Sequence, residues 1–268
     1  MTDRFSVCQF SDDVQPTFLP EEYSYLKFGH DMVIRRLGYE LADKLWAERS
    51  VQLLAQSIVV LPSSYNYVPI AATILTGHFA DRLNQHLIMA GADAVEISQV
   101  HRRATYVPDY GVLTKEERET RHEDHRLYFN HEVIRGDKLL IVVDDVYITG
   151  HHERRLQTGI EDRGINNHVI YVYLGEYQGP DAQIEGRLNS SAIRTVRDYV
   201  EMAKSNYTHM LVRPAKFLLR ADRSELMWAI NQLGPEFAYR LYNACIGENY
   251  HLQPEFEDNA AIVRRMIA

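Results

Sequence analysis

The order of hydrophobic and polar residues predicts strands and helices that alternate through the middle of the chain. Longer segments before or between the strands indicate helices over residues 30–49, 70–90 and 151–163. Four short, mostly apolar runs are typical of strands buried in a parallel sheet: residues 58–61, 94–98, 139–143 and 169–174. We expect right-handed crossovers between them, and such crossovers place ligands at the carboxyl ends of the strands.

The two ends of the chain lack this alternation. The sequence therefore predicts an α/β fold with a helical N-terminal extension at residues 1–50, a parallel-sheet core at 51–180 with helices on both faces, and a helical C-terminal region at 181–268. In the last region we expect four helices: residues 190–205, 223–233, 235–247 and 257–267. This region is expected to cover a ligand as a hood, or to contact a second copy of the chain or another protein.

Composition and charge restrict the classes of ligand. The net charge of -8 over 268 residues argues against non-specific binding to nucleic acid, so any phosphate group must be bound locally. Two cysteines, Cys8 and Cys245, lie far apart and form neither a metal-binding spacing nor a disulfide framework. The sequence begins without a basic and apolar leader, and its apolar runs are far too short to span a bilayer. We expect a cytoplasmic protein that does not insert into membranes.

Residues 138–150, KLLIVVDDVYITG, carry the strongest functional signal. An apolar strand runs into two adjacent carboxylates, Asp144 and Asp145, and then into a short loop that ends at Gly150. Adjacent carboxylates at a strand end need hydrogen-bond donors or a cation, which ribose hydroxyls and Mg²⁺ can supply. The loop and the helix N-terminus that follows present backbone N–H groups, which suit a phosphate. A strand-to-helix turn with a capping acid is the alternative, but it favours one acid rather than two.

This segment resembles the phosphoribosyl-diphosphate signature of the type I phosphoribosyltransferases, in which four apolar residues precede two acids, an apolar residue, two variable positions and Thr-Gly. The resemblance covers about residues 50–175 and implies a phosphoribosyltransferase-type core. It implies that Asp144 and Asp145 hold the ribose and, directly or through water, Mg²⁺. It also implies that the loop holds the 5-phosphate through its backbone and a threonine hydroxyl: Val146, Tyr147, Ile148, Thr149 and Gly150.

Two further segments take expected roles from the same resemblance. After the second core strand, His101, Arg102 and Arg103 stand where the family carries basic residues to the leaving diphosphate in a closing loop. Arg102 and Arg103 are the catalytic candidates and His101 a substrate-binding candidate, whereas a solvated charged loop is the alternative. The loop after the first core strand is expected to bind the diphosphate through its backbone, with a plain polar turn as the alternative: Ser63, Ser64, Tyr65, Asn66 and Tyr67.

The sequence departs from the family just after the signature. His151 and His152 follow Gly150, and many members have a small hydroxyl residue at the second of these positions, so His152 is expected either to replace that hydroxyl at the phosphate or to weaken the site. The resemblance implies a Mg²⁺-dependent transfer of the 5-phosphoribosyl group to an acceptor, expected to be a nucleobase. The alternative is a non-catalytic module that senses phosphoribosyl diphosphate or a nucleotide, as a regulator or a defence-associated effector, because the family contains both kinds of protein.

Overall fold

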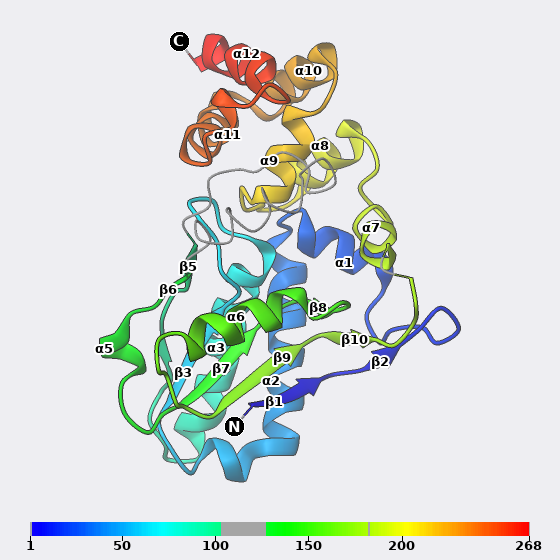
Figure 1. Ribbon diagram of the computed structural model, residues 1–268. Coiled ribbons are helices and arrows are strands. Elements are labelled where there is room, and N and C mark those ends of the chain that lie inside the picture. Colours follow the sequence, from blue (N-terminus) through cyan, green and yellow to red (C-terminus); the bar gives the residue numbers. More distant parts are fainter. Residues whose placement is uncertain (1, 103–126, 182, 268) are drawn as a thin grey trace.

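A five-stranded parallel sheet lies at the centre of the molecule (Figure 1). The computed structural model describes residues 2–102, 127–181 and 183–267. The strands follow the order β1–β9–β7–β3–β4, and every neighbouring pair is parallel. Their bounds are Thr2–Ser6 (β1), Ile58–Pro62 (β3), Glu96–Ile97 (β4), Leu139–Val143 (β7) and Val169–Tyr173 (β9). The expected α/β fold with a parallel sheet is confirmed, and β1 is an additional strand that the sequence did not predict.

Helices cover both faces of this sheet (Figure 1). Alternate residues of one strand enter different cores, because successive side chains of a strand point to opposite faces. In β3, Ile58 and Val60 pack into the core with α2 and α3, whereas Val59 and Leu61 pack into the core with α5 and α6. The four helices are Asp31–Leu53 (α2), Ala71–Met89 (α3), His131–Ile134 (α5) and His151–Glu161 (α6).

The N-terminal segment differs from the expected helical extension. β1 pairs with β9 along its whole length, from Thr2 opposite Val169 to Ser6 opposite Tyr173. Four of the five residues of β1 are polar or charged, as suits a strand at the edge of a sheet, so no apolar run revealed it. A second, small parallel sheet follows, and only then do helices α1 and α2 begin. The strands of this sheet are Gln9–Phe10 (β2), Gly175–Tyr177 (β10) and Val146–Tyr147 (β8). Helix α1 spans Pro20–Lys27.

The C-terminal helices from α8 onwards form a third core of their own, at the end of the molecule that lies beyond the carboxyl ends of the strands, whereas α7 packs into the first core (Figure 1). Phe28 and Val68 from the rest of the chain pack into this core and join the two parts. The bounds are Ile184–Asn189 (α7), Val196–Ser205 (α8), Val212–Leu219 (α9), Arg223–Leu233 (α10), Pro235–Gly247 (α11), Tyr250–Leu252 (η2) and Glu257–Ile267 (α12). The division of the chain at residues 50 and 180 stays a prediction.

Several of these helices differ from the sequence-based expectation, and α7 was not among the four helices expected in this region. α8 begins later than predicted, because Thr195 and Asp198 form a reciprocal capping box that starts the helix at Val196. α9 was not predicted at all. Pro214 lies in its first turn, where a missing backbone N–H costs nothing, so a residue that reads as a helix breaker is tolerated there.

After β4 the chain forms a short strand at the start of the long charged segment. β5, His101–Arg102, pairs antiparallel with β6, Leu127–Tyr128. The expected loop from residue 103 onwards, including Arg103, lies outside the described residues. Among the helices of the described ranges, none combines the length and the apolar character needed to cross a membrane.

Candidate functional site

The acid pair lies where two neighbouring strands end. In the sheet register Val143 of β7 is opposite Pro62 of β3, so the loop after β3 meets the acids that follow β7. Asp144 and Asp145 are 6% and 7% exposed, respectively. Burying two adjacent carboxylates is costly unless donors or cations compensate them, so their partners determine the chemistry of the site.

Asp144 is held by donors from both neighbouring loops. Ser63 Oγ donates to its Oδ2 at 2.6 Å, and the imidazole Nδ1 of His152 lies 3.3 Å from the same oxygen. Burial alone would raise the pKa of Asp144, but the bonds to His152 and Ser63 outweigh it and hold that pKa below its ordinary value. In return, the hydrogen bond and the charge of Asp144 raise the pKa of His152. His152 thus contacts an acid of the pair, a role that the sequence did not predict.

Asp145 is compensated by α1, an element to which the sequence analysis gave no role. Lys27 Nζ lies 2.7 Å from Asp145 Oδ2 and 3.2 Å from Glu185 Oε1, and Tyr23 Oη donates to Asp145 Oδ1 at 3.1 Å. Burial raises the pKa of Asp145, and the charge of Lys27 opposes that rise. Burial would lower the pKa of Lys27, but attraction by Asp145 raises it well above the ordinary value, so the lysine stays charged. The sequence indicated that the acids need a cation, but not which residue supplies it.

The loop from Val146 to Gly150 turns the chain from β8 into α6. Gly150 has a φ of +67°, and a Cβ added there would lie 2.5 Å from Tyr147 Oη, so this turn requires glycine. A small cavity of about 80 Å³ is lined by the loop and the first turn of α6. Arg4 of β1 lies 3.7 Å from the ring centroid of Tyr147 and donates to Glu153 at 2.9 and 2.8 Å. The N-terminal strand therefore supports the loop that we expect to bind the 5-phosphate.

Glu248, the residue after α11, holds the loop that follows β3. Its Oε1 accepts hydrogen bonds from the backbone N–H groups of Tyr67 at 2.9 Å and Val68 at 2.7 Å, and its Oε2 accepts one from Asn66 Nδ2 at 3.3 Å. We call these three bonds the Glu248 clamp. A carboxylate of the C-terminal region thus occupies backbone amides at the end of the loop that we expect to bind diphosphate.

His101 and Arg102 lie beside the same loop rather than at the acid pair. The backbone N–H of Arg102 donates to the backbone carbonyl of the buried Tyr65 at 2.8 Å, and the ring centroids of Tyr65 and His101 lie 5.6 Å apart. Arg102 Nε is buried without a hydrogen-bond partner among the described residues. Burial lowers the pKa of Arg102, against the attraction of Glu248.

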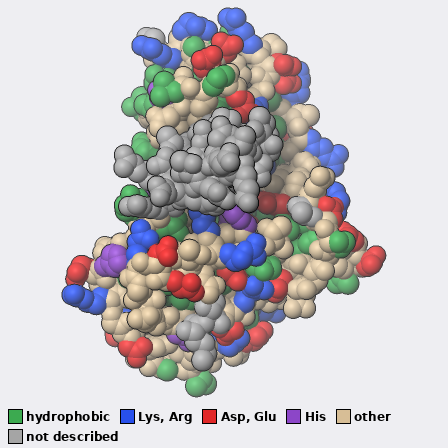
Figure 2. Space-filling view, in the orientation of Figure 1, with side chains coloured by type: hydrophobic (Ala, Val, Ile, Leu, Met, Phe, Trp, Pro, Cys, Tyr) green, Lys and Arg blue, Asp and Glu red, His purple; other side chains and the backbone are tan. Residues whose placement is uncertain are grey.

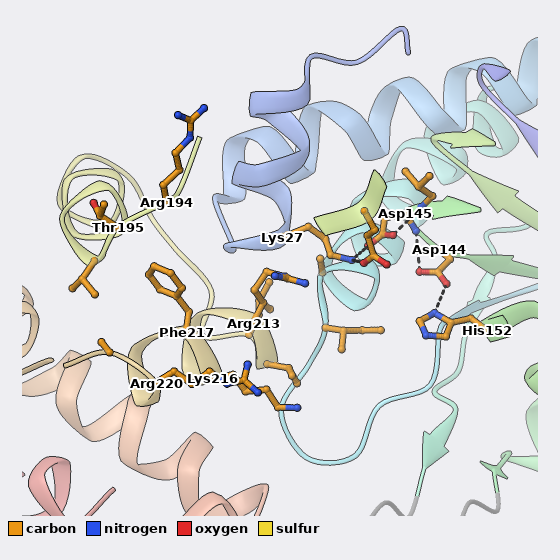
Figure 3. A pocket seen from close by; sticks show the side chains of 18 of the residues that line it. Lys27, Asp144, Asp145, His152, Arg194, Thr195, Arg213, Lys216, Phe217 and Arg220 are labelled. Atoms are coloured by element: carbon orange, nitrogen blue, oxygen red, sulfur yellow. Dashed lines mark hydrogen bonds and ion pairs between the residues drawn. The ribbon is translucent and has the colours of Figure 1, made fainter. Parts of the chain in front are cut away.

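A cavity of about 690 Å³ separates the acid pair from the C-terminal helices (Figure 3). Among the residues of one side, which we call the core wall, are Lys27, Asp144, Asp145, His152 and Glu185. The facing side, which we call the helical wall, includes Arg194, Arg213, Lys216, Phe217 and Arg220. Of the site residues expected from the sequence, four are among those that line the cavity: Asp144, Asp145, Val146 and His152. The helical wall carries no sequence motif, so only the fold reveals it.

Charge on the visible outer surface is mixed. Figure 2 shows acidic and basic side chains interspersed over the described parts of one face, including the C-terminal helices at the top of the view.

Comparisons with known proteins give partial likenesses to hypoxanthine phosphoribosyltransferases. The enzyme from Trypanosoma cruzi is 11% identical, with a TM-score of 0.37, and the match covers 55% of this chain and 75% of that chain. For the Staphylococcus aureus enzyme the identity is 8%, the TM-score 0.33 and the coverage 53% and 73%. The Schistosoma mansoni hypoxanthine-guanine phosphoribosyltransferase in complex with IMP is 12% identical, with a TM-score of 0.33, and the match covers 57% of this chain and 66% of that chain. No curated protein matches the chain.

A family-level match extends far beyond the segment that carries the signature. It covers residues 1–263, and therefore includes both the N-terminal strand and the C-terminal helices. The parallel sheet, the buried acid pair and the glycine turn into α6 lie within it. The chain belongs to the family described as PRTase ComF-like, a phosphoribosyltransferase family.

Proposed function

We propose that the protein binds phosphoribosyl diphosphate and transfers its 5-phosphoribosyl group to an acceptor. The observation that carries this proposal is the arrangement of Asp144, Asp145 and the left-handed Gly150 at the carboxyl end of β7, with the N-terminus of α6 behind them. Two buried carboxylates suit ribose hydroxyls, and a helix N-terminus suits a phosphate. Ligands in parallel α/β sheets bind at this edge.

Each part of the donor has an expected set of contacts. The 2- and 3-hydroxyls of ribose would donate to the acid pair. The 5-phosphate would accept from backbone N–H groups of residues 147–150 and from the Thr149 hydroxyl. The diphosphate would lie against residues 63–67, with Arg102 beside it. Arg102 Nε is buried and has no hydrogen-bond partner within the described part of the chain, which supports this last role, because an anion would supply an acceptor.

The acid pair fits a magnesium ion only together with substrate oxygens or water. The described residues hold no group of three or more His, Cys, Asp or Glu side chains that could bind a metal by itself. Both oxygens of Asp145 and both of Asp144 already accept hydrogen bonds. Mg²⁺ commonly takes one or two carboxylates plus substrate phosphates, so Asp144 would hold it beside the ligand. When bound, the ion would offset charge on the diphosphate.

The reaction would need positioning more than a strong base. The bond between ribose C1 and the diphosphate breaks, and diphosphate leaves with the electron pair, while the acceptor nitrogen forms a bond to C1 and loses its proton. Asp144 and Asp145 would fix the ribose, and the diphosphate contacts would stabilise the leaving group. We expect the acceptor, a nucleobase or a related ring, to enter through the cavity between the two walls.

A non-catalytic sensor is the second candidate, and one observation favours it. The polar groups expected to bind the donor already have partners inside the protein: Lys27 compensates Asp145, and the Glu248 clamp occupies backbone amides. A protein that must only detect phosphoribosyl diphosphate can exchange these contacts for the ligand without performing the transfer.

Release of diphosphate distinguishes the two candidates. The full chain is incubated with phosphoribosyl diphosphate, Mg²⁺ and a panel of nucleobases, and diphosphate is measured against acceptor-free controls and against Asp144→Asn. Acceptor-dependent release that the variant lacks supports the transferase. Tight binding by calorimetry without release under any acceptor supports the sensor. Absence of both binding and release overturns the proposal.

A further inference from the structure

The helical wall of the cavity concentrates positive charge in a protein whose net charge is -8. Arg213, Lys216 and Arg220 are three and four residues apart, and such spacing places side chains on one face of a helix. Figure 3 shows these three side chains on the side that faces the acid pair, with Arg194 on a neighbouring segment. Three of these cations, Arg213, Lys216 and Arg220, therefore line one cavity that is partly open to solvent.

The acids of the core wall are paired within that wall. Lys27 lies 2.7 Å from Asp145 and 3.2 Å from Glu185, and His152 lies 3.3 Å from Asp144, so each acid has a basic partner although the wall as a whole stays acidic. Arg213 contributes only a longer-range attraction to Glu185. The acids of the core wall are therefore engaged locally, and they do not supply counter-charges for the whole helical wall.

The helical wall has acidic neighbours as well. Glu255 pairs with Arg220, and Glu225 is among the residues that line the cavity. Glu248 and Glu255 attract Lys216, but burial and the nearby charge of Arg220 outweigh them and lower its pKa, so an added negative group would be stabilised beside this lysine.

An aromatic ring accompanies these cations. Phe217 follows Lys216 and lines the cavity, together with the apolar side chains of Val196 and Leu211. Aromatic faces bind planar rings by offset stacking. The volume of about 690 Å³ lies within the range of roughly 300–1,000 Å³ that is usual for small-molecule sites.

We propose that the helical wall binds an aromatic acceptor that carries a negative charge, with its ring against Phe217 and its carboxylate or phosphate group between Arg213 and Lys216. This inference rests on the proposed function, because it places the acceptor opposite the donor that the acid pair would hold. It names a class of acceptor: a heteroaromatic acid or a phosphorylated ring compound rather than a neutral base. The C-terminal helices thereby act as the hood of the site.

Matched pairs of probes test the charge preference. Calorimetry with the full chain compares nicotinate with nicotinamide, and orotate with uracil, because each pair shares a ring and differs in the anionic group. We expect the acid of at least one pair to bind about tenfold tighter than its neutral partner, a difference equivalent to roughly 1.4 kcal/mol. Equal affinities within both pairs, or binding of neither acid, would overturn the inference.

Variants locate the preference on the helical wall. Arg213→Met combined with Lys216→Met should abolish the preference for the acid, whereas Arg213→Lys, which keeps the charge, should retain most of it. Lys44→Met is the matched control, because Lys44 is exposed on α2 away from the cavity. If the double variant does not fold, the wild-type probe pairs and Arg213→Lys still decide.

The same titrations with phosphoribosyl diphosphate keep the two proposals separate. If the α9 double variant loses affinity for phosphoribosyl diphosphate but keeps the preference for acidic rings, the cations serve the donor and the inference is wrong. If the wild type prefers acidic rings but does not bind phosphoribosyl diphosphate, the proposed function fails while the anion-binding helical wall remains.

Discussion

The two walls of the cavity differ in how the sequence encodes them. Four residues of the core wall come from a strand end and a helix start that are nearly contiguous, within residues 144–152. The helical wall is drawn from α9 and from the segment before α8, and α9 is positioned by packing within the C-terminal core. One wall is therefore a local motif, whereas the other is a product of tertiary structure.

This difference teaches where shared chemistry and individual specificity can reside. A motif held in register by a sheet binds the part of a ligand that all members of a family would share, such as ribose 5-phosphate. Loops and helices packed over that edge vary more freely, so they suit the part of the ligand that differs. Lys27 complicates the division, since it joins the core wall from α1, outside the motif.

The largest effect is expected from removing the ion pair between Lys27 and Asp145 in the core wall. Asp145→Asn leaves Lys27 buried with the half-exposed Glu185 as its one remaining carboxylate partner among the described residues. Breaking one partner out of a buried pair typically costs 3–5 kcal/mol, and we expect roughly 3 kcal/mol of the free energy of unfolding because Glu185 remains. Urea denaturation measures the change.

An exposed acid away from the cavity provides the control. Asp162→Asn, at the end of α6, should change the free energy of unfolding by less than about 0.5 kcal/mol. Adding Lys27→Met to Asp145→Asn should recover part of the loss, because the unpaired charge is then absent. Equal free energies of unfolding for Asp145→Asn and Asp162→Asn would show that the buried charge of Lys27 does not need Asp145 as its partner.

The second prediction concerns the contact between the C-terminal region and the core loop. Glu248→Ala removes all three bonds of the Glu248 clamp, but water can replace the bond to the exposed Tyr67 N–H. We expect a loss of about 2 kcal/mol in the free energy of unfolding, whereas Glu257→Ala on the exposed side of α12 should cost far less.

The same variant tests whether the Glu248 clamp competes with a ligand. A carboxylate and a diphosphate are both anionic acceptors, so removing the first should free amides for the second. We expect inorganic diphosphate to bind about fivefold tighter to Glu248→Ala, equivalent to roughly 1 kcal/mol. Weaker binding would instead mean that the clamp holds the loop in the shape that diphosphate requires.

The sequence predicted the fold where local patterns suffice. Apolar runs located β3, β7 and β9, because strands buried on both faces need continuous hydrophobic residues. β1 was not predicted, because an edge strand can be largely polar, and neither was α9, a helix of eight residues with Pro214 in its first turn. Such elements become visible only through the neighbours that they pack against.

The candidate site shows the same limit. The register of Asp144, Asp145 and Gly150 could be predicted because the chemistry is contiguous. The partners of the acids could not, because Lys27 and Ser63 lie 118 and 81 positions away from them in sequence. Long-range ion pairs are chosen by the fold, and a single sequence carries no local signal for them.

The smallest effect sharpens the role of His152 within the core wall. Its pKa is raised by Asp144, so the ion pair stabilises the folded state fully below the unfolded pKa of about 6.5, and this stabilisation is lost as the pH rises through the raised pKa. The side chain is 69% exposed, so we expect no more than about 0.5 kcal/mol. The free energy of unfolding at pH 6 and pH 8 for wild type, His152→Gln and the control His131→Gln measures it. Only His152→Gln should lose the pH-dependent difference.

The ion pair also changes what His152 can contribute to a ligand. Because Asp144 already raises the pKa of His152, an arriving phosphate adds less further charge to this imidazole than to an isolated histidine, so phosphate affinity should depend less on pH. If affinity for phosphoribosyl diphosphate instead rises strongly from pH 8 to pH 6, and His152→Gln removes that rise, the imidazole exchanges Asp144 for the phosphate. His152 would then be the residue that replaces the missing hydroxyl of the signature.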